Sequence, residues 1–104
     1  MFTLNFRFVA QKTDVNASID GRHPIHYASD YGQTDVIKYL LDNGADVNAK
    51  DKHGISALLA AIYEGHTSSV KLLIDRGADR SGKTPDGKSY AEVAEKADIV
   101  SLLK

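Results

Sequence analysis

The chain of 104 residues has a formal net charge of −1; 42% of its residues are hydrophobic and 26% are charged. This composition predicts a single globular domain, and a charge so close to zero lacks the basic excess with which proteins hold nucleic acid. No apolar run approaches the ~20 residues that span a bilayer, and the absence of cysteine excludes disulfides and thiolate metal sites. We therefore expect neither a nucleic-acid nor a membrane partner.

A repeated unit organises the sequence. Glycines recur at a spacing of 33 residues, at Gly21, Gly54 and Gly87. The segments that follow them recur in step, at residues 23–28, 56–61 and 89–94, and so do two Gly-Ala-Asp segments, at 44–46 and 77–79. A 33-residue period with a T-P-L-H-x-A-like segment and a G-A-D segment is typical of ankyrin repeats, and residues 14–104 resemble that family.

The resemblance implies an all-α ankyrin-repeat solenoid, in which helix-turn-helix units are joined by β-turn finger loops. We expect one domain over residues 1–104. Its predicted parts are a degenerate N-terminal part-repeat at 1–20, repeats at 21–53 and 54–86, and a C-terminal capping repeat at 87–104. Stacked units share one continuous core through nearest-neighbour contacts, so a short array can still be stable.

The first 13 residues are the irregular part of the pattern. They contain Phe2, Phe6 and Phe8, whose spacing fits a strand as well as a helix. Two interpretations stay open: the segment covers the next repeat as a substitute cap, or a shortened start has left a tail. The segment has neither the basic start nor the apolar core of a secretory signal, so we expect the protein in the cytoplasm, or also in the nucleus.

Helix signals follow in order within each unit. Pro24 suits a first helical position, and Ser56 and Ser89 suit the capping position just before a helix. In the repeat at 21–53 the capping position holds His23, which is a weaker cap. Glycines that favour helix ends follow, and the second helices carry apolar positions on one face. These positions are Val36, Ile37, Leu40 and Leu41, then Val70, Leu72, Leu73 and Ile74.

The C-terminal unit has the composition of a polar cap. We expect a packing face of Ala91, Val93, Ala94, Ile99, Val100, Leu102 and Leu103. The charged and polar residues between them are expected to cover the outside, which keeps arrays from associating end to end.

No residue pattern indicates an active site. His23 and His26 lie three residues apart, but His53 and His66 form no matching close pair, and no phosphate-binding glycine loop or activated nucleophile is present. We therefore expect no enzyme activity, no metal and no cofactor. His26 occupies the histidine position of the ankyrin motif, and the resemblance implies that it ties neighbouring fingers together by a structural hydrogen bond.

Function is therefore expected from the surface. The resemblance implies a protein partner bound on the concave side, which the fingers and first helices form. There we expect Arg22, His23, Tyr27, Tyr31, Lys52, His53, Tyr63, Glu64, Asp86 and Lys88. Tyr and Arg are frequent binding anchors, although Tyr27 and Tyr63 could instead pack between helices.

The central repeat has a more particular wording, Leu58-Leu59 followed by Tyr63-Glu64-Gly65-His66. Here the chain resembles a group of small, stand-alone ankyrin proteins that bind the heterodimeric actin capping protein and block its attachment to filament barbed ends. This resemblance implies a monomeric, stoichiometric inhibitor of capping protein. The altered first repeat keeps an alternative open, namely a generic ankyrin adaptor or a transcription-factor-binding regulator with a different protein partner.

Overall fold

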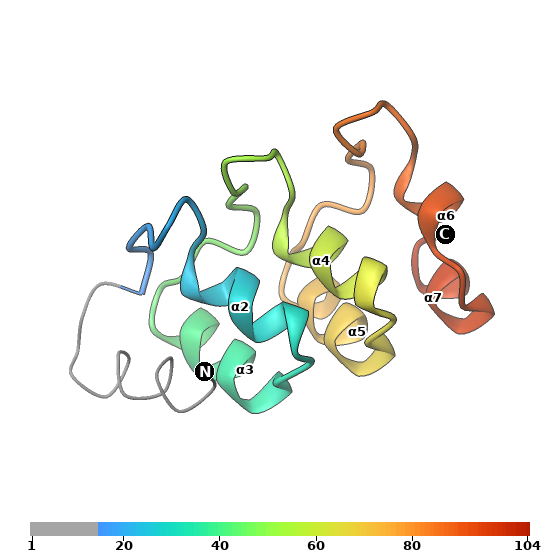
Figure 1. Cartoon of the computed structure of the whole chain (residues 1–104). Coiled ribbons are helices and arrows are strands. Elements are labelled where there is room, and N and C mark those ends of the chain that lie inside the picture. Colours follow the sequence, from blue (N-terminus) through green and yellow to red (C-terminus); the bar gives the residue numbers. More distant parts are fainter. Residues whose placement is uncertain (1–14) are drawn as a thin grey trace.

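The repeated sequence folds into a row of helical hairpins whose connecting loops project to one side (Figure 1). The computed structural model describes residues 15–104, so the two interpretations of residues 1–13 lie outside the described residues. The helices are α2 (Pro24–Asp30), α3 (Thr34–Asp42), α4 (Ala57–Glu64), α5 (Thr67–Asp75), α6 (Tyr90–Val93) and α7 (Ala97–Leu102). The predicted all-α repeat solenoid is confirmed, while the exact repeat boundaries stay a prediction.

Polar groups at the first turn determine where the first helix of a hairpin begins. The Ser56 hydroxyl accepts the Leu59 amide at 3.1 Å before α4. At α2 the predicted weak cap is compensated from inside the helix, because Nδ1 of His26 accepts the His23 amide at 3.0 Å. A side chain at the third helical position thus satisfies an amide of the cap residue, as the glutamate of a capping box does.

The three finger loops are hairpin-like turns closed by isolated bridges. Lys50 pairs with Ser56 and Lys83 with Ser89, at the same place in successive units. The first finger is tighter, since Ile19 pairs with Arg22 around Asp20 and Gly21, whose φ angles are 56° and 81°. Two central residues with positive φ are what a two-residue type I′ turn requires. Val15 lies six residues before Gly21, whereas Val47 lies seven before Gly54, and the tight turn accommodates this shorter spacing.

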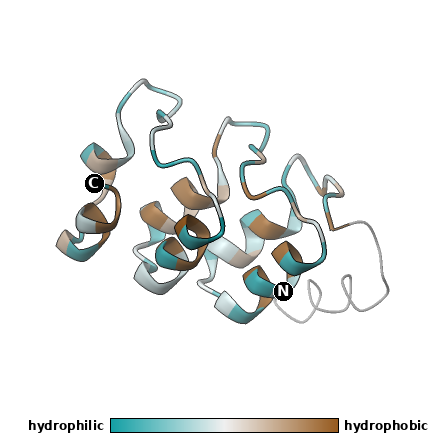
Figure 2. Ribbon diagram, turned by 180° about the vertical axis from the view of Figure 1, so that it is seen from behind, coloured by the Kyte–Doolittle hydropathy of each residue, from teal (hydrophilic) through white to brown (hydrophobic). Residues whose placement is uncertain are grey.

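The buried apolar residues of the hairpins form one core cluster, and Figure 2 shows the hydrophobic stretches of the helices that contribute to it. Apolar side chains from both helices of each hairpin are buried in it. The largest fully buried ones are Ile25, Ile37, Leu40, Leu58, Leu59, Leu73, Val70 and Ile99. Leu59 stands one period after His26, so the same buried position holds a hydrogen-bonded imidazole in one unit and a leucine in the next.

Asparagine side chains join the bases of the first two fingers to the next unit. Asn16 donates to the Gly44 carbonyl at 2.9 Å and accepts the Asp46 amide at 2.8 Å. Asn48 repeats the pattern one unit later with Gly77 and Asp79. Each asparagine satisfies a carbonyl and an amide just past the end of a helix, where backbone groups lack helical partners.

The last unit differs from the sequence prediction at two of the expected packing residues. Ile99 is buried, and Val93, Ala94, Leu102 and Leu103 pack against the core. Ala91, however, is exposed, and Val100 is half-buried without packing against the core. Helix α6 has four residues, and its inward position is occupied by Tyr90, whose hydroxyl lies 3.0 Å from that of Ser56.

Gly32 combines a left-handed backbone with a close neighbour. Its φ is 64°, and a Cβ atom there would lie 2.8 Å from Cγ and Nδ1 of the His66 ring. That ring is held in place, because its Nε2 lies 2.9 Å from the Asp30 carbonyl oxygen. Gly44 also has a positive φ, 97°, but nothing lies within 4 Å of the same point.

We predict that Gly32→Ala destabilises the protein more than Gly44→Ala. Both substitutions force a left-handed alanine, which costs about 1–2 kcal/mol. Gly32→Ala also displaces the His66 ring, which adds about 1–3 kcal/mol. Urea unfolding of the two variants measures the difference, and equal losses would contradict the role given to the His66 contact.

Candidate protein-binding surface

A groove lies between the first and second hairpins, on the side where the fingers meet α2 and α4. Its volume is about 340 Å³. It is lined by Arg22, Asp30, Asp51, His53, Ile55, Ala60, Tyr63 and Glu64. Four of these, Arg22, His53, Tyr63 and Glu64, are among the residues predicted to bind a partner. We call the exposed residues of the fingers and of α2 and α4, together with this groove, the inner surface.

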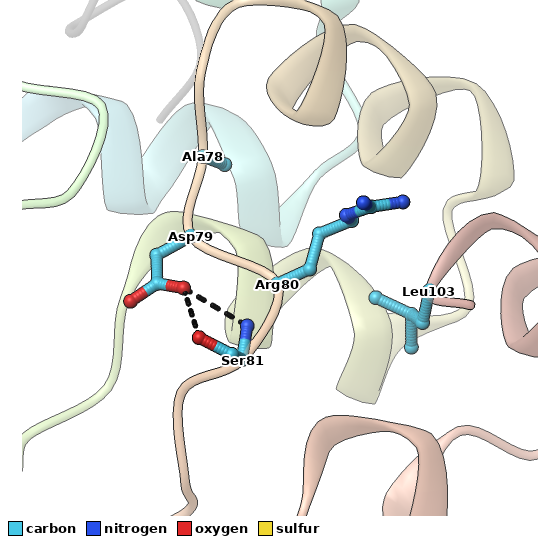
Figure 3. Close-up of a pocket in the computed structure, with 5 residues that line it drawn as sticks. All are labelled: Ala78, Asp79, Arg80, Ser81 and Leu103. Carbon is cyan, nitrogen blue, oxygen red and sulfur yellow. Dashed lines mark hydrogen bonds between the residues drawn. The ribbon is translucent and has the colours of Figure 1, made fainter.

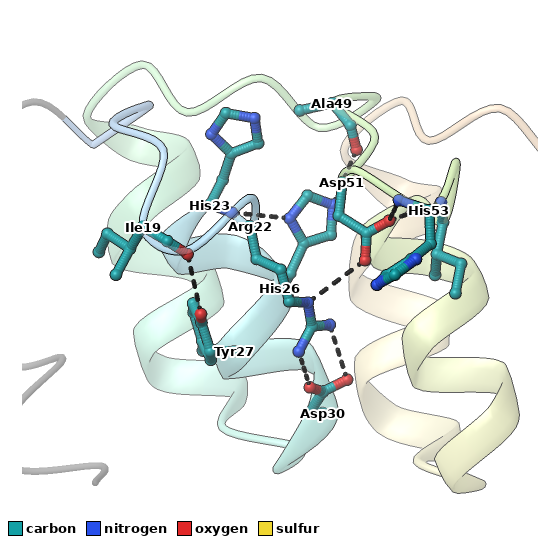
Figure 4. Close-up of polar contacts among 10 residues, drawn as sticks. Ile19, Arg22, His23, His26, Tyr27, Asp30, Ala49, Asp51 and His53 are labelled. Carbon is teal, nitrogen blue, oxygen red and sulfur yellow. Dashed lines mark hydrogen bonds and ion pairs between the residues drawn. The ribbon is translucent and has the colours of Figure 1, made fainter.

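Arg22 forms one wall of the groove and joins two units (Figure 4). Its two terminal nitrogens pair with the carboxylate of Asp30 at the end of α2. Its Nε lies 3.3 Å from Oδ2 of Asp51 in the next finger, an ion pair without the alignment of a hydrogen bond. The guanidinium also lies 5.0 Å from the centre of the Tyr27 ring. Arg22 is therefore held from three directions by its own chain.

Asp51 organises the second finger. Its Oδ1 accepts the amides of His53 at 2.8 Å and Ile55 at 3.0 Å. Burial by itself would raise the pKa of Asp51, but the hydrogen bonds from Ile55 and His53, with the charge of Arg22, outweigh it and hold this pKa below its ordinary value. A carboxylate that stays charged can shape the turn and pair with Arg22 at once.

His26 makes the predicted tie between units. Its buried ring accepts the His23 amide through Nδ1, and its Nε2 lies 3.0 Å from the Ala49 carbonyl, to which the N–H of that tautomer donates. The structural hydrogen bond expected from the ankyrin motif is therefore confirmed. Burial, aided by the charge of Arg22, lowers the pKa of His26, although the bond to Ala49 opposes the shift.

Contacts within the chain cover part of the surface of Arg22, His23 and Tyr27. Arg22 makes the contacts above, and Nδ1 of His23 lies 2.8 Å from the Asn16 carbonyl. The Tyr27 hydroxyl donates to the Ile19 carbonyl at 2.9 Å, beneath the Arg22 guanidinium. All three are half-buried. Tyr27 thus contacts the first finger and Arg22, and its contact with a partner stays a prediction.

The other predicted residues are presented to solvent. Tyr31 is 49% exposed and Tyr63 is 48% exposed. Lys52, His53, Glu64, Asp86 and Lys88 are exposed as well, the last two at the tip of the third finger. The exposed ring of Tyr63 is accessible to a partner. Contact with a partner stays a prediction for the whole set.

Asp30 and Asp51 belong to the groove but were not predicted. Asp51 carried a usable signal, because it stands one period before Thr84, and both begin a four-residue turn that ends at glycine. In the third finger the Thr84 hydroxyl accepts the Lys88 amide at 2.9 Å, which parallels the bonds of Asp51. Asp30 carried no such signal, since Tyr63 occupies the position one period later.

Two further hollows lie nearer the C-terminal end. One of about 250 Å³ also has Tyr63 and Glu64 in its wall, together with Ile62, Gly65, Val93, Glu95 and Lys96. The other, of about 360 Å³, lies between the base of the third finger and Leu103, where Asp79 accepts hydrogen bonds from Ser81 (Figure 3). The hollow beside Leu103 contains none of the predicted binding residues. The other hollow and the groove share Tyr63 and Glu64, so the inner surface is centred on these two residues.

Two other kinds of site are absent from the part of the chain that the structure describes. Over residues 15–104, no group of three His, Cys, Asp or Glu side chains could hold a metal ion. No helix within the same range is long and apolar enough to cross a bilayer. The geometry offers a hollowed surface with exposed tyrosines, which suits the binding of a partner.

Stacked helical hairpins with a hollowed finger side define a repeat-scaffold protein of the interaction class. Residues 25–74 match the ankyrin repeats (many copies) family. The chain belongs to the ankyrin-repeat family and is a protein–protein interaction module.

Curated relatives share short stretches with the chain. Myotrophin of Xenopus tropicalis is 50% identical over 40 residues, which is 38% of this chain and 34% of that protein. An ankyrin repeat protein of Rickettsia bellii is 44% identical over 43 residues, 41% of this chain and 18% of the relative. The Neurogenic locus Notch protein of Drosophila melanogaster is 39% identical over 56 residues, 52% of this chain and 2% of that protein. The chain thus spans less than two thirds of these relatives.

We predict that His26 makes folding stability depend on pH. Its folded pKa lies below the ordinary 6.5, so the unfolded chain takes up a proton more readily. The free energy of unfolding should be highest above about pH 6.5 and should fall as the pH drops toward the folded pKa.

Urea unfolding between pH 7 and pH 5 measures this dependence. His26→Leu should lose about 1–3 kcal/mol at pH 7, because the His23 amide and the Ala49 carbonyl lose their partner, and its pH dependence should be flatter. His53→Leu, at an exposed histidine, serves as the control and should keep the wild-type dependence. A His26→Leu variant as pH-dependent as the wild type would count against this assignment.

Proposed function

We propose that the protein binds the heterodimeric actin capping protein through its inner surface and so keeps capping protein from filament barbed ends. Membership of the ankyrin family supports a protein partner. The similarity to myotrophin and the particular wording of the central repeat support this choice of partner. Capping protein acts on cytoplasmic actin, so we propose the cytoplasm as the place of action.

The observation that carries the proposal is the position of Tyr63 and Glu64. They stand between two hollows and line both of them. Tyr63 leaves nearly half of its surface in solvent, at 48%. An exposed tyrosine flanked by hollows offers a partner an anchor that can be buried on both sides, and such central aromatic residues often dominate binding energy.

The proposed mechanism is occupancy and needs no covalent step. One molecule of this protein would cover one capping protein, and the inhibited fraction would follow the concentration of the inhibitor relative to its dissociation constant. The groove does not need to form on binding, because the Arg22 contacts already hold its wall. A preformed surface avoids part of the ordering cost of association.

We predict that the protein restores barbed-end elongation of actin in the presence of capping protein. Tyr63→Ala should raise the concentration needed for half-restoration about 10-fold, because an anchor of this kind contributes about 1–2 kcal/mol. Tyr39→Ala is a matched control, since Tyr39 is 46% exposed on α3, away from the groove. It should change that concentration by less than about 2-fold.

Elongation rates of labelled filaments give the result directly. No restoration at high excess of the protein would refute the proposed partner. A pull-down that lacks both capping-protein subunits would favour the alternative, an adaptor or transcription-factor-binding regulator with another protein partner.

A further inference from the structure

Three lysines of the second and third fingers differ from the lysines of α3, α5 and the start of α7. On α3 and α5, which we call the outer helices, Lys38 pairs with Asp42 at 3.1 Å and Lys71 with Asp75 at 2.9 Å. At the start of α7, the Lys96 ammonium donates to the Gly65 carbonyl at 2.8 Å. Within residues 15–104, by contrast, the ammonium groups of Lys50, Lys52 and Lys83 have neither an ion pair nor a hydrogen bond.

These lysines lie along one edge of the molecule. Lys50 and Lys83 occupy the same bridge position in successive fingers, 33 residues apart. Lys52 is at the tip of the second finger, where its stem lies against Gly21, and Lys88 is at the tip of the third. All four are exposed, and we call them the lysine edge.

Nearby acids leave the charge of the lysine edge largely unmatched. Lys88 is 3.9 Å from Asp86, the longest ion pair of the described chain, and Asp86 already accepts the Thr84 hydroxyl. Asp79 is attracted by Lys50, and Glu92 by Lys83 and Lys88. Each acid, however, already accepts hydrogen bonds from a nearby serine, Asp79 from Ser81 and Glu92 from Ser89. Exposed charges at such distances are weakly coupled, because solvent and salt screen them.

We infer that the lysine edge binds an acidic segment of the protein partner, through Asp or Glu side chains. The inference rests on the proposal that the inner surface binds a protein, and it adds Lys50 and Lys83 to the predicted Lys52 and Lys88. Neighbouring helical units pack about 10 Å apart, and an extended chain advances about 3.3 Å per residue. Side chains of an extended chain face the same side at every second residue, so carboxylates two to four residues apart, roughly 7–13 Å, would meet Lys50 and Lys83 together.

An acidic peptide suits this edge better than nucleic acid does. Four lysines on two fingers give few phosphate contacts, and the net charge of −1 offers no long-range attraction for a polyanion. Over a short range the lysine edge can still attract a few carboxylates. Beside it, the groove supplies the exposed Tyr63 as an uncharged anchor, so the edge would add specificity and orientation to the contact.

Octaglutamate is the probe, titrated into the ¹⁵N-labelled chain of 104 residues while amide chemical shifts are recorded. We expect shifts at residues 50–54 and 83–88 and weaker binding as salt is added. The double substitution Lys50→Glu with Lys83→Glu should weaken binding about 10-fold, because it turns attraction into repulsion.

The matched control is Lys38→Glu with Lys71→Glu, which changes the net charge equally on the outer helices. It should alter octaglutamate binding by less than about 2-fold. Equal loss in both variants, or shifts spread over the helices, would overturn the inference. So would tighter binding of a single-stranded oligonucleotide of equal charge at the same residues. The titration contains no capping protein, so its failure would leave the proposed partner untouched.

Discussion

The contact of Arg22 with Asp30 and Asp51 is the constraint on which the rest of the structure depends. It joins the first helical hairpin to the second finger, and it forms a wall of the groove that the two units share. Repeats touch only their neighbours, so the shape of a shared surface is set by the contacts between two adjacent units. A half-buried guanidinium between two carboxylates permits few alternative arrangements, because each of its positions is set by a pairing with one of the two acids.

Several weaker ties act in the same direction. His26 links α2 to the second finger, Asn16 and Asn48 link finger bases to following hairpins, and His66 reaches back to Asp30. Each satisfies a backbone group that helix ends or turns leave without a partner. Together they hold the fingers at defined positions beside the helices, and the exposed Tyr63 and the lysine edge therefore keep fixed relative places. The proposed partner would meet a surface with an aromatic anchor and a separate cationic edge.

Much of this organisation could be predicted from the sequence, because repetition makes local signals reinforce one another. The 33-residue spacing of Gly21, Gly54 and Gly87 indicated the fold, and the position of His26 indicated its hydrogen bond between units. The ion pair of Arg22 with Asp51 could not be predicted in the same way. It departs from the repeat, since Ile55 and Lys88 stand where Arg22 would recur, and it depends on how the shorter first finger places its last residue. Binding also depends on the complementary surface of the partner, which the sequence of this chain does not contain.

The central claim is that Arg22 and Asp51 hold two units in one arrangement, and a double-mutant cycle in the free energy of unfolding tests it most directly. Arg22→Met keeps much of the apolar stem, and Asp51→Asn keeps an oxygen for the His53 and Ile55 amides, so the cycle isolates the charge interaction. We predict a favourable coupling of about 1–2 kcal/mol between the two residues at pH 7. A coupling within about 0.3 kcal/mol of zero would contradict the account, because the two side chains would then be neighbours that do not hold the units together.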